Sequence, residues 1–179
     1  NKVFVFSDLL RSLKNSEDLI IDNEEELNNA LTFFYERGVI LFHSETENII
    51  LDVQWCVDAF KCIILDGIHI DFKYRGFEQL YEYGLLYNEL LDKLWQNDNF
   101  SQHKTSLVNH MKQLHMLAEL SDGLWYVPCM NKQSYSSTIL TNCNVSSRFC
   151  FLFEFLPFVI YHRLVVACIN ILEMKPWKS

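Results

Sequence analysis

The sequence predicts an α+β fold, made of tandem winged-helix-like units followed by the start of a β-strand/helix subdomain. Half of the 179 residues are hydrophobic and 15% are aromatic, which is enough apolar side chain for a real core. Glycine and proline are scarce, with 5 and 3 residues, which favours helices joined by short hairpins over an all-β sandwich. Twice along the chain, a stretch of helical periodicity leads into a short apolar hairpin.

The first helices are indicated by apolar spacing and by end signals. Apolar side chains over residues 3–13 predict a helix that ends near Asn15. A second helix should begin at Asn23, whose side chain can accept a backbone N–H bond, with Glu26 three residues later as in a capping box. Its apolar face comprises Leu27, Ala30, Leu31 and Phe34. Gly38 suits the left-handed backbone just past a helix end.

A first wing and a third helix complete the first unit. Strands are predicted at Val39–His43 and Asn48–Val53, on either side of a polar turn. The helix that follows buries a stripe made of Cys56, Ala59, Phe60, Ile63 and Ile64. Asp66-Gly67 stops this helix, so the unit spans about residues 20–67.

A second unit of similar design spans about residues 76–128. Short helices are predicted before and after Gly84, the second one covering Leu86–Trp95. Ser101 is expected to cap a third helix. The apolar face of that helix comprises Leu107, Val108, Met111, Leu114 and His115. Asp122-Gly123 between two apolar runs is a strong hairpin signal, and the two units together make a first subdomain of residues 1–130.

The rest of the chain reads as a linker and an incomplete second subdomain. Residues 131–147 are polar and turn-prone, which predicts the linker, and residues 148–179 begin the second subdomain. One fully aromatic strand face is predicted from Phe149, Phe151, Phe153 and Phe155. Pro157 fits the first turn of a helix whose apolar side includes Tyr161 and Leu164. That proline and a polar pair at the centre of the helix argue against a membrane span.

Charge is distributed unevenly, and this bears on possible partners. Residues 1–60 carry four basic and twelve acidic side chains, whereas residues 131–179 carry five basic and two acidic ones. An acidic N-terminal segment is a poor match for the phosphate backbone of a nucleic acid. The helix over residues 102–115 carries Lys104 and Lys112 without an acid, so a winged-helix nucleic-acid-binding module is kept as the alternative function.

Motifs for catalysis, cofactors and metals are not found. The sequence contains no GxxxxGK[ST], GxGxxG, GxSxG or HExxH pattern, so we expect no enzyme activity and no cofactor. His103 and His110 are two helical turns apart, roughly 10 Å, which is too far for two ligands of one metal. The six cysteines form no CxxC pair, so reduced, buried thiols are expected. Trp55, Trp95 and Trp125 are expected to be core anchors.

Three segments in order carry a resemblance to a known family. A helix ends at Gly38 before an apolar strand, and Leu51-Asp52-Val53-Gln54-Trp55 opens the next helix. Tyr83-Gly84-Leu85 leads to Leu94-Trp95 and later to Val127-Pro128, and a strand-to-helix junction follows at residues 151–164. This order resembles the COR region that follows the GTPase domain in Roco proteins. Val53 stands where the family usually has proline, so this junction is expected to be looser.

The resemblance implies a non-catalytic domain of a cytoplasmic signalling protein. It implies a first subdomain that packs against a Ras-like GTPase domain of the same parent chain and a second that commonly forms the dimer contact. We therefore expect a GTPase-facing surface at Glu24, Glu25, Glu45 and Glu47. We expect a homo-oligomer contact at Phe151, Phe153, Pro157, Tyr161 and Leu164.

Overall fold

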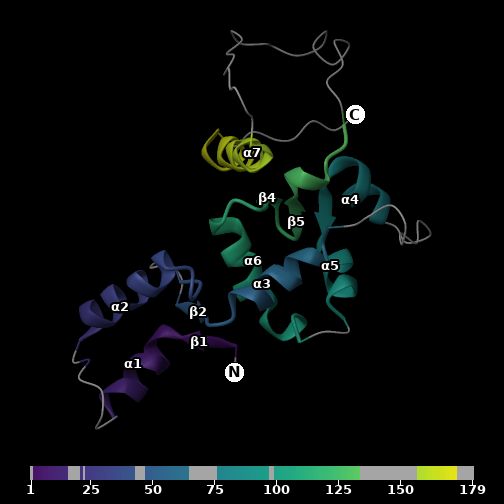
Figure 1. Cartoon of the computed structure of the whole chain (residues 1–179). Helices are drawn as coiled ribbons and strands as arrows, with labels where there is room; N and C mark the ends of the chain where they lie inside the picture. The colour runs from purple at the N-terminus through teal and green to yellow at the C-terminus, as the bar shows by residue number, and fades with distance from the viewer. Residues whose placement is uncertain are drawn as a thin grey trace. The chain divides into compact units, whose positions relative to one another are not determined.

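The fold is α+β, as predicted, with two small antiparallel sheets set among helices (Figure 1). The computed structural model describes residues 2–15, 21, 23–42, 47–64, 76–96, 99–133 and 157–172. Contacts divide the chain into two compact units, unit 1 being Asn1–Ile64 with Asp92–Leu114, and unit 2 being Leu65–Leu91 with His115–Ser179. The two units therefore interleave along the sequence. The predicted linker at residues 131–147 lies mostly outside the described residues, and the predicted domain boundaries stay predictions.

Unit 1 begins with a strand where the sequence predicted a helix. β1 (Val3–Val5) pairs antiparallel with β2 (Asn48–Ile50), with Val3 opposite Ile50, and α1 (Phe6–Lys14) follows directly. The prediction of a helix over residues 3–13 is therefore wrong for its first three residues. Two β-branched side chains in alternation favour extended backbone, and a distant partner strand satisfies the hydrogen bonds of these residues.

The signals at both ends of α2 (Glu24–Glu36) act as predicted. The Asn23 side chain accepts a hydrogen bond from the backbone N–H of Glu26 at 2.9 Å. Gly38 adopts the left-handed conformation, with φ of 69°. The strand predicted after it is reduced to one bridge, in which Leu41 and Ile50 exchange backbone bonds of 2.8 and 2.9 Å.

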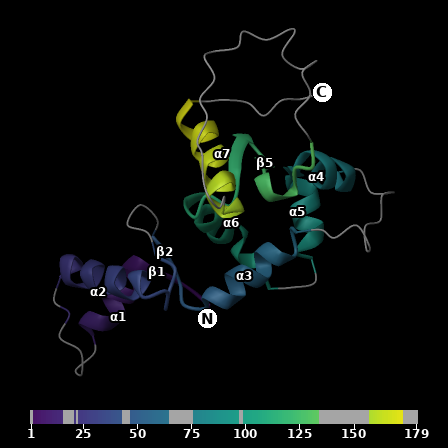
Figure 2. The ribbon, with the colours of Figure 1, turned by 45° about the horizontal axis from the view of Figure 1, so that its top comes forward.

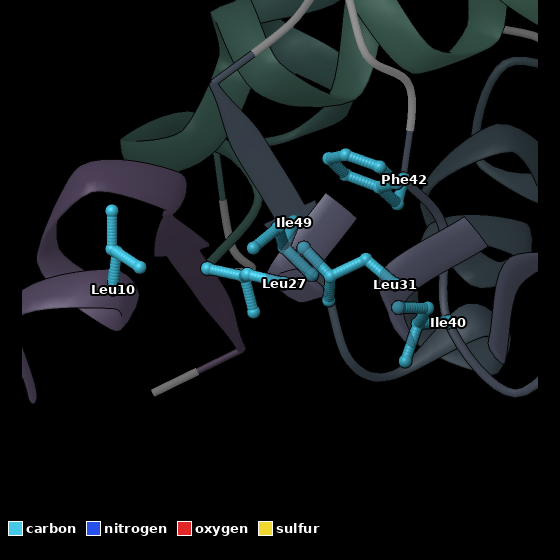
Figure 3. Packing of buried hydrophobic residues seen from close by; sticks show 6 residues of the cluster. All are labelled: Leu10, Leu27, Leu31, Ile40, Phe42 and Ile49. Atoms are coloured by element: carbon cyan, nitrogen blue, oxygen red, sulfur yellow. The ribbon is translucent and has the colours of Figure 1, made fainter. Parts of the chain in front are cut away.

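A cluster of aliphatic and aromatic side chains forms one core of unit 1 (Figure 3). It comprises Leu10, Leu27, Leu31, Ile40, Phe42 and Ile49. These side chains come from α1, α2, the segment after Gly38 and β2, so the core joins parts of the chain that are up to 39 residues apart in sequence. Phe34, predicted on the same buried face of α2, is 46% exposed, so this part of the prediction is wrong.

Tryptophans anchor the second half of unit 1. α3 (Val53–Lys61) packs against α6 (Lys104–Gln113), and Trp55 lies 5.6 Å, centroid to centroid, from Phe100. The Trp95 indole N–H donates a 3.0 Å hydrogen bond to the carbonyl of Ala59, near the end of α3. Trp55, Trp95 and Trp125 are all buried, which confirms the prediction that they are core anchors.

One predicted helix start is wrong. Ser101 does not cap a helix, because a short 3-10 turn, η1 (Ser101–His103), precedes α6 and neither start has a side-chain cap bond. Leu107, Val108 and Met111 are buried as the helical spacing predicted. The backbone of His115 has φ of 56°, so this residue lies beyond the helix and not on its apolar face.

Unit 2 is built around a three-stranded antiparallel sheet in the order β3-β5-β4. Its sheet consists of β3 (Leu85–Tyr87), β4 (Ala118–Ser121) and β5 (Leu124–Tyr126). The hairpin of β4 and β5 around Asp122-Gly123 confirms the prediction. β3 was missed, since its residues were assigned to the start of the helix α5 (Asn88–Leu94).

Three more elements of unit 2 surround this sheet. They are α4 (Phe77–Tyr83), η2 (Pro128–Met130) and α7 (Phe158–Leu172). α7 lies beside the sheet (Figure 2) and buries Val166 and Ile169 against Leu85, Ala118 and Tyr126. Within the described parts of the chain, no helix has the length and apolar character needed to cross a bilayer.

Candidate interaction surfaces

The first turn of α2 presents three consecutive carboxylates to solvent. Glu24, Glu25 and Glu26 are all exposed, and the Asn23 cap holds the backbone beneath them. Negative side chains at a helix N-terminus interact favourably with the helix dipole, so this turn is compatible with a stable helix. Of the predicted GTPase-facing residues, Glu24 and Glu25 therefore share one exposed turn. Glu47 is exposed before β2, and Glu45 lies outside the described residues.

The other end of α2 carries exposed aromatic side chains. Phe33, Phe34 and Tyr35 are 51%, 46% and 39% exposed, and Val39 in the following turn is 55% exposed. The rings of Phe33 and Phe34 meet edge to face with centroids 5.7 Å apart. Clustered exposed apolar side chains are typical of protein contact sites. Our sequence analysis did not identify this surface.

Helical geometry alone predicts that some of these aromatic side chains are exposed. Successive side chains of an α-helix are turned by about 100°, so three consecutive aromatics cover roughly 200° of the helix surface. One buried stripe cannot hold all three. The run from Phe33 to Tyr35 therefore requires that part of it faces solvent or a partner.

α7 has a buried side and an exposed apolar side. Val166 and Ile169 face the sheet, while Tyr161, Leu164 and Ile171 are 52%, 49% and 78% exposed. Tyr161 and Leu164 are three residues apart, so they lie on the same helical face. The structure thus places these two predicted contact residues on one face, one and two turns after Pro157. Phe151 and Phe153 lie outside the described residues.

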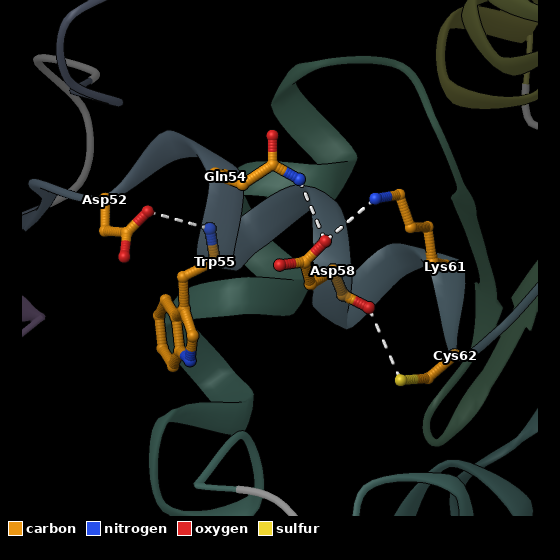
Figure 4. Close-up of polar contacts among 6 residues, drawn as sticks. All are labelled: Asp52, Gln54, Trp55, Asp58, Lys61 and Cys62. Atoms are coloured by element: carbon orange, nitrogen blue, oxygen red, sulfur yellow. Dashed lines mark hydrogen bonds and ion pairs between the residues drawn. The ribbon is translucent and has the colours of Figure 1, made fainter.

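The start of α3 is held by a cap that the sequence analysis overlooked (Figure 4). The Asp52 side chain accepts the backbone N–H of Trp55 at 2.9 Å. It also pairs with the Lys2 ammonium at 3.1 Å. The bond from the Trp55 N–H, followed by the contact with Lys2, holds the pKa of Asp52 below its ordinary value. The Asp52 cap stabilises this first turn, and the looser junction expected from Val53 stays a prediction.

Polar contacts continue along the surface of α3 (Figure 4). One carboxylate oxygen of Asp58 accepts hydrogen bonds from the Lys61 ammonium at 2.9 Å and the Gln54 amide at 2.8 Å. These bonds, that of Lys61 first, lower the pKa of Asp58. The thiol of Cys62 donates to the Asp58 carbonyl at 3.3 Å. All three contacts join residues three or four positions apart on one helix, so they stabilise α3.

Two histidines and one lysine of η1 and α6 make contacts within unit 1. His110 is buried, and its Nε2 lies 3.2 Å from the carbonyl oxygen of Asn48. The ring of His103 packs edge-on against Trp55, and Lys104 pairs with Asp92. Among the described residues, no three potential metal ligands lie close together. The nucleic-acid-binding alternative stays a prediction.

The cysteines in the described part of the chain lie in different environments. Cys56 is buried, Cys62 and Cys168 are half-buried, and Cys129 is exposed. Burial raises the pKa of the Cys56 thiol to about 11, so this side chain is a poor nucleophile at neutral pH. The expectation of buried thiols is confirmed for Cys56 and is wrong for Cys129.

Comparison with known proteins shows a likeness in fold. No protein-family model and no curated protein matches this sequence. Among solved structures, the fold resembles that of Methanosarcina barkeri Roco2 RocCORdC bound to GDP. The TM-score is 0.53 and the sequence identity is 14%. The match covers 73% of this chain but 39% of that chain, so the likeness concerns part of a larger protein.

Proposed function

We propose that this chain is a COR-like domain of a Roco-type signalling protein, and that it packs against an adjoining Ras-like GTPase domain. The observation that carries the proposal is the likeness in fold to Roco2 RocCORdC over 73% of the chain. In this proposal the domain is cytoplasmic and non-catalytic, takes no cofactor, and acts through its surfaces.

The order of elements in the second predicted unit supports the winged-helix-like interpretation. From Phe77 to Tyr126 the chain forms a helix, a strand, two helices and a hairpin. The first strand of this segment, β3, pairs with the last, β5, which gives the sheet order β3-β5-β4. The COR resemblance of the sequence and the likeness in fold point to the same class of domain from different observations.

The acidic surface of unit 1 is the proposed GTPase side. Glu24 and Glu25 are exposed on one turn, and residues 1–60 carry a large excess of acidic side chains. Such a surface attracts a partner with basic side chains and repels an acidic one. We therefore expect binding that weakens as ionic strength rises, because exposed charges are screened over about 10 Å at 0.1 M salt.

The exposed side of α7 is the proposed contact between two copies of the chain. Tyr161 and Leu164 present apolar surface there, next to Pro157. Sedimentation velocity of the chain and of Leu164→Glu tests this, because a buried carboxylate at a contact disfavours association. Asn170→Glu is the matched control, since it adds the same charge at another exposed position of α7. A wild-type chain that stays monomeric at high concentration would contradict the contact.

Signal relay requires that the GTPase contact responds to the nucleotide. The switch segments of a Ras-like GTPase differ between nucleotide states, and a contact made with them shifts the population of domain arrangements. Calorimetric titration of the chain with the GTPase domain of its parent polypeptide, loaded with GDP and then with a GTP analogue, tests this. Different Kd values in the two states would support relay. Equal values would support packing without relay, and no binding in either state would contradict the proposed function.

A further inference from the structure

The apolar stripe of α2 continues beyond the core that it helps to build. Leu27 and Leu31 are 2% and 6% exposed, so this side of the helix faces the interior of unit 1. Phe34 and Tyr35 follow Leu31 by three and four residues and therefore lie on the same helical face. They are nevertheless 46% and 39% exposed. The last turn of α2 thus leaves part of its apolar side uncovered.

This end of α2 is ordered by its own contacts. The backbone N–H of Val39 donates to the Phe34 carbonyl at 3.0 Å, and that of Gly38 donates to Tyr35 at 2.9 Å. The Arg37 guanidinium lies over the Phe33 ring, 4.8 Å from its centroid. Side chains held in place before binding lose less conformational entropy when a partner arrives. We call Phe33, Phe34, Tyr35 and Val39 the α2 aromatic end.

Charge indicates the chemistry of the partner. α2 contains four glutamates, three of them in its first turn, and no basic residue. The next residue, Arg37, is a cation, and its guanidinium lies over the Phe33 ring. Its first turn and the α2 aromatic end are separated by roughly 15 Å along one helix, by helix rise. A second copy of the chain would bring like charges together over this surface, which is unfavourable. The fitting partner is a protein surface that presents apolar side chains flanked by lysine or arginine.

We propose that the α2 aromatic end, flanked by the acidic first turn of α2, is the docking surface for an apolar and basic patch of the adjoining GTPase domain. This inference rests on the proposed function, and it identifies the part of the chain that makes the contact. Aromatic side chains dominate the affinity of many protein contacts, while surrounding charges chiefly set the rate of association and the salt dependence.

The test is a calorimetric titration of the whole chain with the GDP-bound GTPase domain, using wild type and two variants. Phe33→Ala/Phe34→Ala should weaken binding at least about tenfold, as expected for aromatic anchors of an interface. Glu24→Gln/Glu25→Gln should weaken binding a few-fold and reduce its dependence on salt. Far-UV circular dichroism of each variant checks that α2 remains folded, and alanine does not lower helix propensity.

A matched control separates this surface from exposed apolar side chains in general. Leu51 and Val57 are 46% and 39% exposed in the same unit, so Leu51→Ala/Val57→Ala removes comparable exposed apolar surface elsewhere. This control should bind as wild type does. If the Phe33/Phe34 variant also binds as wild type does, the inference is overturned while the proposed function stands.

Two other outcomes would also overturn the inference. If the wild-type chain does not bind the GTPase domain, both the inference and the proposed function fail. If the wild-type chain instead self-associates in sedimentation velocity and Phe33→Ala/Phe34→Ala abolishes that association, the occupant of the α2 aromatic end is a second copy.

Discussion

Replacement of Gly84 by alanine should destabilise the chain more than the same change at Gly38. Both glycines follow a helix and have φ of 69°. A left-handed backbone costs an alanine about 1–2 kcal/mol at either site. At Gly84 the added Cβ would also lie 2.6 Å from the carbonyl oxygen of Val127, whereas nothing lies within 4 Å at Gly38.

The extra cost at Gly84 comes from a backbone that has little room to move. The backbone N–H of Val127 donates to the Gly84 carbonyl at 2.8 Å, and the Gly84 N–H donates to Leu80 at 3.0 Å. Relieving the clash strains these bonds, and overpacking of this kind costs about 1–3 kcal/mol. We therefore expect losses of about 2–5 kcal/mol for Gly84→Ala and about 1–2 kcal/mol for Gly38→Ala.

Urea unfolding followed by far-UV circular dichroism measures both losses against wild type. Alanine restricts the unfolded chain similarly at both positions, so this contribution largely cancels in the comparison. A loss at Gly84 no larger than the loss at Gly38 would refute the close approach of Val127.

Three further predictions concern unit 1. Trp95→Phe removes the donor to the Ala59 carbonyl and part of a buried side chain. The free energy of unfolding should therefore fall by about 2–4 kcal/mol. A urea titration that shows a loss under about 0.5 kcal/mol would contradict this bond. Cys56, with its pKa raised to about 11, should react with a thiol reagent at pH 8 far more slowly in the folded chain than in urea, and equal rates would rule out its burial. The pKa of Asp52 is lowered in the folded chain, so its contribution is present above the unfolded pKa and is lost as pH falls through the folded pKa. Asp52→Asn should therefore make the thermal midpoint less sensitive to pH below about 5. An unchanged acid response would argue against the contacts of Asp52 with the Trp55 N–H and Lys2.

Local chemistry explains the parts of the fold that the sequence predicted well. The Asn23 cap, the left-handed Gly38 and the hairpin at Asp122-Gly123 each depend on residues within about four positions of one another. The spacing of Leu107, Val108 and Met111 likewise needs only one helix. Such features can be read from a short window of sequence because their hydrogen bonds and packing are formed within it.

Distant pairing explains the errors. Val3–Val5 reads as part of a helix in isolation, and it becomes a strand because Asn48–Ile50 supplies its hydrogen bonds. Leu85–Tyr87 is a strand for the same reason, with β5 as its partner. Phe34 has the helical spacing of a core residue, but its side chain is exposed. How much of a helix is buried depends on which other elements pack against it, and these lie elsewhere in the chain.

Of the candidate surfaces, only the features that depend on local sequence were predicted. Exposure of Glu24 and Glu25 follows from their charge, and Tyr161 and Leu164 share a face because of their spacing. The α2 aromatic end depends on where the neighbouring core stops, which no local pattern specifies. The Asp52 cap was predictable from local sequence, because aspartate is a favoured N-cap residue and Asp52 lies at the start of the predicted helix.

The most direct test of a COR-like role is hydrogen exchange of this chain, alone and mixed with the GDP-bound GTPase domain of its parent polypeptide. Amides at a contact exchange more slowly because binding stabilises the closed state. The account predicts slower exchange in unit 1, greatest over Glu24–Val39, in the presence of the GTPase. Identical exchange throughout the chain, with and without the GTPase, would contradict it.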